Sequence, residues 1–162
     1  MLNKIVKKVF ITAVIVVATV TAVTFFVNLY SEKNELLLYN SETNEIYRTF
    51  PVSEGTEFSV EFIHSVNKSP VKDVFVIRNE EIVVDRTIYS AFGAGVQTEI
   101  EEGQKLEYDK DGNMVVSGFN IVFPVVKYIV GTVYDHVLCI QGECISLTEL
   151  CGKNAHVAFK LK

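Results

Sequence analysis

The chain has 162 residues, a formal net charge of −5 and a hydrophobic fraction of 49%. This length accommodates one membrane segment and one domain of about 130 residues, which is enough to bury a hydrophobic core. Every acidic residue follows position 31, so the later part of the chain carries 20 acidic and 12 basic side chains. Its net charge of about −8 disfavours nucleic acid and anionic lipid headgroups as partners.

An uncharged apolar segment occupies residues 9–27, and three lysines precede it. A helix of this length rises about 1.5 Å per residue and crosses a hydrocarbon core of ~30 Å. The segment closes on Phe25 and Phe26, which do not form the small-x-small site of a cleaved signal peptide. We therefore expect a membrane-anchored protein with a cytoplasmic amino terminus: a basic tail over 1–8, a transmembrane signal anchor over 9–28, a hinge over 29–34 and an extracytoplasmic domain over 35–162.

After the hinge, short segments rich in Val, Ile, Phe and Tyr alternate with turn residues, and no longer window shows a helical period. This pattern predicts an all-β domain, an antiparallel β-sandwich or a barrel-like fold. The expected strands are 35–39, 45–50, 57–64, 71–78, 81–90, 105–108, 114–116, 125–130, 136–140, 144–147 and 156–161.

A two-residue turn at Asn79-Glu80 predicts the register of the central hairpin. With this turn Phe75 lies opposite Val84, and two positions further Asp73 lies opposite Arg86. Opposite charges would then face each other across the hairpin.

A row of three polar side chains follows when the preceding strand is added. If Phe62 lies opposite Phe75, then His64 lies opposite Asp73, which has Arg86 on its other side. One interpretation is a salt-bridged row that fixes the strand register and holds no ligand. The other is an anion-binding or histidine-activating pocket at the end of the sheet.

The loop that starts at His64 concentrates polar groups, and a glycine-rich segment follows at 92–95. Such glycines allow backbone N–H groups to cradle an anion, or simply form a bulge. The candidate ligand-binding residues are His64, Ser65, Lys68, Ser69, Asp73, Arg86, Gly93, Ala94 and Gly95.

A catalytic alternative would use Ser65 or Ser69 with His64 as an extracytoplasmic serine hydrolase. Neighbouring residues on a strand point to opposite faces, so His64 and Ser65 would need a bent loop to exchange a proton. Because no Gly-x-Ser-x-Gly motif is present either, we assign no catalytic residue. We expect no metal or cofactor, and we interpret His136 and His156 as structural.

The three cysteines are Cys139, Cys144 and Cys151. A Gln141-Gly142 turn places Cys139 opposite Cys144 in a pair with a Cα separation of about 4.5 Å, the short end of the disulfide range. A Cys139–Cys144 disulfide would leave Cys151 free. Three unpaired thiols are the alternative.

Three motifs together resemble a known family: His64-Ser65-Val66, then Lys68-Ser69-Pro70-Val71 with Asp73 and Phe75 behind it, and later Phe92-Gly93-Ala94-Gly95. They resemble the bacterial family called domain of unknown function 1850, over roughly residue 59 to the carboxyl end. Members of that family look like small exported or membrane-anchored proteins, often encoded beside TAXI-type TRAP transporters, which move carboxylates. The resemblance implies an accessory role near such a transporter.

We therefore expect a binding or accessory module with a membrane transporter subunit and a small carboxylate as possible partners. In this hypothesis His64, Lys68 and Arg86 supply positive charge or donors, Asp73 orients them, and residues 93–95 add backbone N–H groups. The serine hydrolase is one alternative, and a structural scaffold without a ligand is the other.

Overall fold

The fold is described from a computed structural model, which describes residues 34–90 and 100–162 together with 14, 16, 17 and 19–21. The chain divides into two units, Met1–Lys33 and Asn34–Lys162. In the first unit the described residues are helical. None of the helices found among the described residues has the length and apolarity that crossing a membrane requires. The predicted tail, most of the predicted anchor, 9–28, and all of the predicted hinge except Asn34 lie outside the described residues, so these stay predictions.

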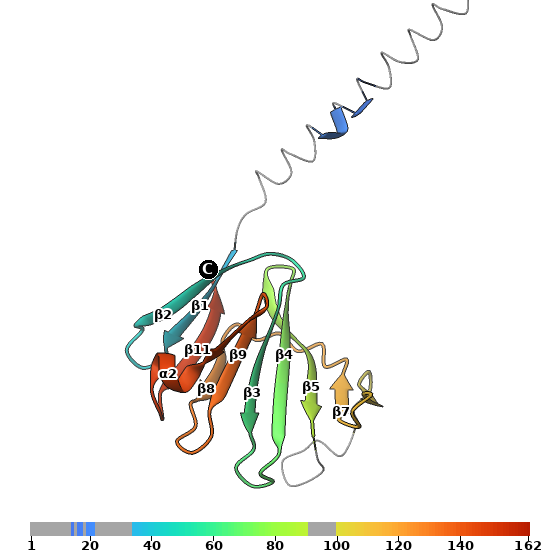
Figure 1. The fold of residues 1–162 in the computed structure, drawn as a ribbon. Helices are drawn as coiled ribbons and strands as arrows, with labels where there is room; N and C mark the ends of the chain where they lie inside the picture. Colours follow the sequence, from blue (N-terminus) through green and yellow to red (C-terminus); the bar gives the residue numbers. More distant parts are fainter. Residues whose placement is uncertain (1–13, 15, 18, 22–33, 91–99) are drawn as a thin grey trace, which may run out of the picture. The chain divides into compact units, whose positions relative to one another are not determined.

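Residues 34–162 form an all-β unit with two antiparallel sheets (Figure 1). Sheet A has the strand order β2-β1-β11-β8, and sheet B has the order β10-β9-β3-β4-β5-β7-β6. The strands are β1 (Asn34–Asn40), β2 (Ile46–Val52), β3 (Glu57–Ile63), β4 (Pro70–Arg78), β5 (Glu81–Tyr89), β6 (Lys105–Tyr108), β7 (Met114–Ser117), β8 (Val126–Ile129), β9 (His136–Ile140), β10 (Glu143–Ser146) and β11 (His156–Leu161).

The predicted all-β fold is confirmed, and each predicted strand matches an observed strand within two residues at either end. A five-residue helix, α2 (Leu147–Cys151), was not predicted. Ser146 caps it, because its Oγ accepts the Glu149 N–H at 3.0 Å. A single helical turn is too short to produce a helical period in the sequence.

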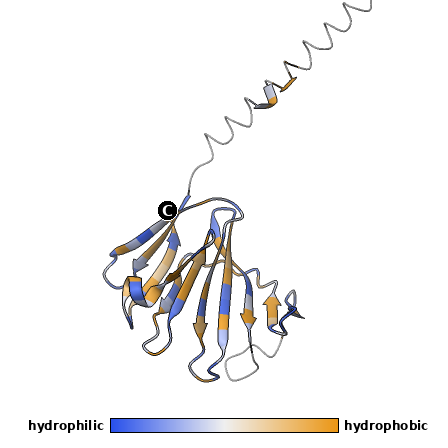
Figure 2. Cartoon of the chain, viewed as in Figure 1, coloured by the Kyte–Doolittle hydropathy of each residue, from blue (hydrophilic) through white to orange (hydrophobic). Residues whose placement is uncertain are grey.

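The hydrophobic core lies between the two sheets and draws on both. Phe58 of β3 is 1% exposed, and its ring stacks on Phe75 of β4 at 5.0 Å between centroids. Phe159 of β11 contacts the same ring at 5.5 Å from the opposite sheet. Figure 2 shows hydrophobic residues along the strands of both sheets. The alternation of apolar and polar residues thus buries one face of each sheet against the other.

Asn34 and Lys162 lie at one end of this sandwich, where Glu35 and Lys162 exchange backbone hydrogen bonds of 3.2 and 2.9 Å. The loop between β3 and β4 and the loop between β8 and β9 lie together at the other end (Figure 1). These two loops position the first of the two pockets described below.

The predicted register of β3 and β4 is wrong. Phe75 lies opposite Phe58, not Phe62, and Asp73 lies opposite Val60. The loop between the strands is shorter than predicted, because the His64 N–H donates to the Ser69 carbonyl at 2.9 Å. The error is a shift of four residues, and an even shift leaves every side chain on the same face of the strand. Hydrophobic alternation therefore predicted the faces correctly and could not discriminate between the registers.

The predicted hairpin of β4 and β5 is correct near its turn. Ile77 lies opposite Ile82 and Phe75 opposite Val84. Asn79 and Glu80 have φ of 52° and 60°, which is typical of a type I′ turn.

Beyond that point a β-bulge changes the register, and the predicted pairing of Asp73 with Arg86 is wrong. Asp73 lies opposite Thr87, and Arg86 lies opposite Val74. The extra residue, Asp85, lies where β5 changes neighbours, from the 121–123 segment to β7. Because the bulge shifts β5 by one residue, it places Arg86 on the other face of the sheet. The predicted row of His64, Asp73 and Arg86 does not form.

The predicted pairing of Cys139 with Cys144 is present. The two residues form a disulfide with a Cα–Cα distance of 4.1 Å, and Cys151 is a free, half-buried thiol. Burial raises the pKa of the Cys151 thiol to about 11. This cysteine is therefore protonated and unreactive at neutral pH.

Candidate functional site

Three of the predicted ligand-binding residues, His64, Ser65 and Lys68, line one cavity of about 450 Å³. This cavity, called the loop pocket below, lies where the β3–β4 loop meets the β8–β9 loop. Its volume falls within the range of about 300–1,000 Å³ that is usual for small-molecule sites. The other lining residues are Phe62, Ile63, Ile129, Gly131, Thr132, Val133, Tyr134 and His136.

The loop pocket has a basic lining. Its charged or ionisable lining groups are Lys68, two histidines and a tyrosine, and none of the described lining residues is acidic. The Lys68 ammonium lies 5.7 Å from the centre of the Tyr134 ring, within range of a cation–π contact. Lys68 adopts φ of 56°, and its N–H donates to the His64 carbonyl at 2.9 Å, which closes the loop.

The His64 side chain is oriented by its own loop. Its Nδ1 accepts long hydrogen bonds from the N–H groups of Val66 and Asn67, at 3.4 and 3.5 Å. A neutral imidazole that accepts at Nδ1 carries its proton on Nε2. The ring therefore offers Nε2 as a donor at the pocket.

His136 is a pocket residue that the sequence analysis interpreted as structural. Its Nδ1 accepts the Gly131 N–H at 3.1 Å, and its ring stacks on Phe62 at 5.1 Å. Burial lowers the pKa of His136, partly offset by the neighbouring Asp135 carboxylate, so the ring is neutral at pH 7. The β8–β9 loop needs glycine at 131, because a Cβ there would lie 2.1 Å from the Tyr134 carbonyl oxygen.

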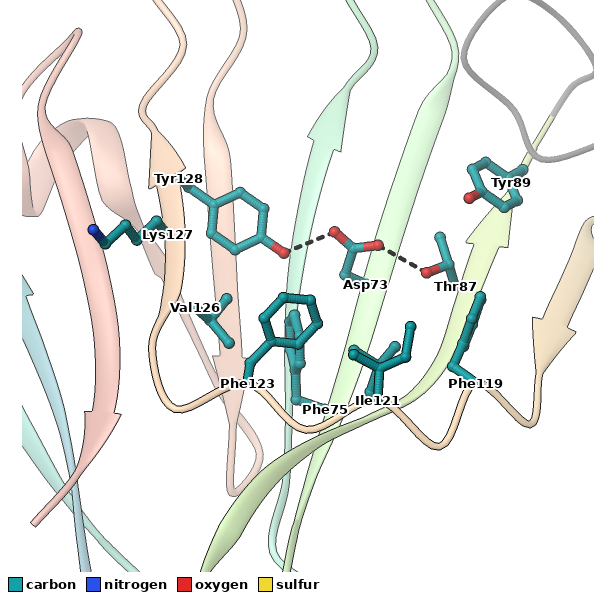
Figure 3. A pocket seen from close by; sticks show the side chains of 11 residues that line it. Asp73, Phe75, Thr87, Tyr89, Phe119, Ile121, Phe123, Val126, Lys127 and Tyr128 are labelled. Carbon is teal, nitrogen blue, oxygen red and sulfur yellow. Dashed lines mark hydrogen bonds between the residues drawn. The ribbon is translucent and has the colours of Figure 1, made fainter. Parts of the chain in front are cut away.

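Asp73 lies in a different cavity, of about 330 Å³, between the two sheets (Figure 3). We call this cavity the inter-sheet pocket. The Thr87 hydroxyl donates to Asp73 Oδ1 at 2.9 Å, and the Tyr128 hydroxyl donates to Oδ2 at 2.7 Å. Burial, and next the Asp73 charge, raise the pKa of Tyr128, which keeps its hydroxyl protonated as a donor.

The walls of the inter-sheet pocket are apolar, and part of them comes from the 118–124 segment, which connects β7 to β8. Phe119, Ile121 and Phe123 of this segment line the cavity opposite Asp73, with Phe75 of β4 beside them (Figure 3). This wall was not predicted from the sequence. The alternation of Phe119, Ile121 and Phe123 was the signal that could have revealed an inward-facing extended segment.

Tyr128 separates the two pockets. Its hydroxyl binds Asp73, while its ring lies 6.1 Å from Phe62 and 6.1 Å from His136, which both line the loop pocket. Neither Tyr128 nor Thr87 was predicted as a site residue. No sequence motif marks them, because they approach Asp73 from distant parts of the chain.

Arg86 contributes to neither pocket. Its guanidinium forms two hydrogen bonds of 3.3 Å with the Glu57 carboxylate and a contact with Asp85. These interactions, Glu57 first and Asp85 next, raise the pKa of Arg86 although burial opposes them. The charge that was expected to hold a carboxylate is thus already neutralised on the other face of sheet B.

The remaining predicted residues are not brought together with these groups. Ser69 is 7% exposed, and its Oγ has no hydrogen-bond partner in the described part of the chain. Neither Ser65 nor Ser69 hydrogen-bonds the His64 ring within residues 34–90 and 100–162, so the geometry gives the hydrolase hypothesis no support. Gly93, Ala94 and Gly95 lie outside the described residues. Among those that are described, no cluster of His, Cys, Asp and Glu could hold a metal.

Comparison with known proteins yields one match. A family model described as domain of unknown function (DUF1850) matches residues 58–147, which is more than half of the chain. No curated protein and no solved structure matches. The matched range includes the β3–β4 loop, Asp73, Tyr128 and His136.

Proposed function

The chain belongs to the DUF1850 family, and we propose that it is a membrane-anchored, extracytoplasmic binding module whose loop pocket takes a small carboxylate. In this proposal the module assists a TRAP-type carboxylate transporter. The single observation that carries the proposal is the basic lining of the loop pocket in a chain of net charge −5.

The chemistry of the loop pocket suits an anion. Lys68 supplies a positive charge, and His64 and His136 each accept at Nδ1, which leaves Nε2 as a donor. The Ser65 and Thr132 side chains add hydroxyl groups to the lining. Charge-assisted hydrogen bonds from such donors are the usual way in which proteins hold carboxylates.

The described residues of the amino-terminal helix support a membrane anchor. Thr19 and Thr21 donate their hydroxyls to the carbonyls of Val16 and Val17, both at 2.9 Å. Such bonds satisfy a hydroxyl inside its own helix, as an apolar environment requires. Val17 is 63% exposed, and an exposed valine face is stable in lipid and unfavourable in water.

The position of the loop pocket supports an accessory role. The β3–β4 and β8–β9 loops that form it lie at the end of the sandwich away from the C-terminus (Figure 1), whereas Glu35 pairs with Lys162 at the other end. Val66 and Val133, at the tips of the two loops, are 66% and 80% exposed. Two apolar tips beside a basic pocket are suited to contact another protein.

The ligand test uses the full chain in detergent micelles and isothermal titration with acetate, succinate and benzoate. We expect at least one carboxylate to bind, and Lys68→Met to weaken it about tenfold, because a charge-assisted hydrogen bond contributes about 1.5–3 kcal/mol. Lys110→Met, at an exposed lysine of the β6–β7 turn, should leave the affinity unchanged. Absence of binding by all three, or an equal effect of both variants, would refute the ligand assignment.

The partner test places a photo-crosslinking amino acid at position 133, on the exposed loop tip, and at position 110 as a control. After illumination of native membranes, we expect a transporter subunit to be captured from position 133 alone. Capture from both positions, or of no membrane protein, would instead favour a scaffold without this partner.

A further inference from the structure

We propose that the inter-sheet pocket is a second binding site, which takes the positively charged amino group of a small ligand with an apolar, preferably aromatic, body. This site is distinct from the loop pocket in position and in charge. The proposal therefore goes beyond the carboxylate-binding function and does not depend on it.

Asp73 is held by two neutral donors and has room for more. Both of its oxygens accept hydroxyl hydrogen bonds, from Thr87 at 2.9 Å and Tyr128 at 2.7 Å. Each carboxylate oxygen has two lone pairs, so each can accept one further bond. An ammonium group in the pocket would therefore add charge-assisted hydrogen bonds to a carboxylate that so far has only neutral donors.

No cationic side chain in the described part of the chain forms an ion pair with Asp73. Lys127 lines the pocket, but it is an exposed residue, and its amino group lies on the far side of Tyr128 from Asp73 (Figure 3). The charge of Asp73 is therefore available to a ligand.

The size and lining of the cavity also suit such a ligand. Its volume of about 330 Å³ suits a small aromatic amine. Phe75, Phe119 and Phe123 face the space in front of Asp73 (Figure 3). Aromatic rings provide apolar contact for the body of such a ligand, and their faces attract its ammonium group.

The experiment measures binding of benzylammonium and of benzyl alcohol, its neutral counterpart, to the full chain in detergent by isothermal titration. We expect the wild-type protein to bind benzylammonium at least tenfold more tightly than benzyl alcohol. Asp73→Asn should abolish this preference, because it removes the charge and retains the size of the side chain. Asp111→Asn, the same change at an exposed aspartate of the β6–β7 turn, should retain it.

A second variant keeps the test valid if Asp73→Asn fails to fold. Ile121→Trp fills the cavity from a side chain that is 44% exposed and leaves Asp73 untouched. It should abolish benzylammonium binding in a protein that stays folded. The proposal is overturned if the wild type does not prefer the ammonium probe, or if a folded Ile121→Trp protein binds it as tightly as the wild type does.

Discussion

The two pockets of this domain lie on either side of one tyrosine and are built in opposite ways. The loop pocket is formed mainly by two loops at the end of the sandwich, and Lys68 supplies its charge. The inter-sheet pocket is formed mainly by strands and a connecting segment, and Asp73 supplies its charge. Tyr128 donates its hydroxyl to Asp73 in the inter-sheet pocket, and its ring packs against Phe62 and His136, which line the loop pocket. The difference teaches that a single tyrosine can lie between a basic site and an acidic one and contact residues of both.

The largest effect is expected from Gly118→Ala, which should disturb the inter-sheet pocket and leave the loop pocket intact. Gly118 has φ of +78°, and a Cβ there would lie 2.4 Å from the Gly103 carbonyl oxygen. The strained φ costs about 1–2 kcal/mol and the overlap about as much again, so we expect about 3 kcal/mol of destabilisation in urea unfolding. Benzylammonium binding should fall with it, because the 119–123 wall begins at this residue.

A matched control separates strain from overlap. Gly112 has a similar φ of +82°, but a Cβ there meets nothing within 4 Å. Gly112→Ala should therefore cost only the backbone term of about 1–2 kcal/mol and leave the wall in place. Equal destabilisation by the two variants would show that the contact with Gly103 does not shape the segment.

The counterpart for the loop pocket is Gly131→Ala. Gly131 has no positive φ, but the substitution brings a Cβ within 2.1 Å of the Tyr134 carbonyl oxygen, so the β8–β9 loop must move. We expect about 1–3 kcal/mol of destabilisation and a loss of acetate binding, measured by urea unfolding and titration. Benzylammonium binding should persist. If both ligands were lost, the two pockets would not be independent.

The smallest expected effect is the pH dependence of stability that His136 of the loop pocket causes. Burial lowers the pKa of His136 in the folded chain, whereas in the unfolded chain it titrates near 6.5. The unfolded state therefore takes up this proton first as the pH falls. The contribution of His136 to stability is present above pH 6.5 and is lost as the pH falls from 6.5 through the folded pKa. Urea unfolding at several pH values should show this loss, and His136→Gln should lack it. Parallel pH curves for the two proteins would contradict the prediction.

Local chemistry was sufficient to predict much of this molecule. Alternating apolar residues predicted every strand, and in β3 and β4 they also predicted which side chains share a face. The turns at Asn79-Glu80 and Gln141-Gly142 predicted two registers, and the second of these placed Cys139 opposite Cys144. These features depend on residues close together in the chain, so they can be read without knowledge of the fold. The association of His64, Ser65 and Lys68 was predictable for the same reason.

The tertiary structure decided the register between neighbouring strands and the side chains that contact Asp73. The register of β3 against β4 differs from its alternatives by even shifts, which bury the same faces. The bulge at Asp85 lies where β5 changes its neighbouring strand. Because of this bulge, Thr87 lies opposite Asp73 in place of Arg86. Tyr128 reaches that carboxylate from the opposite sheet. Thr87 and Tyr128 lie 14 and 55 positions from Asp73, so the local sequence does not select these contacts, and the assembled strands and sheets do.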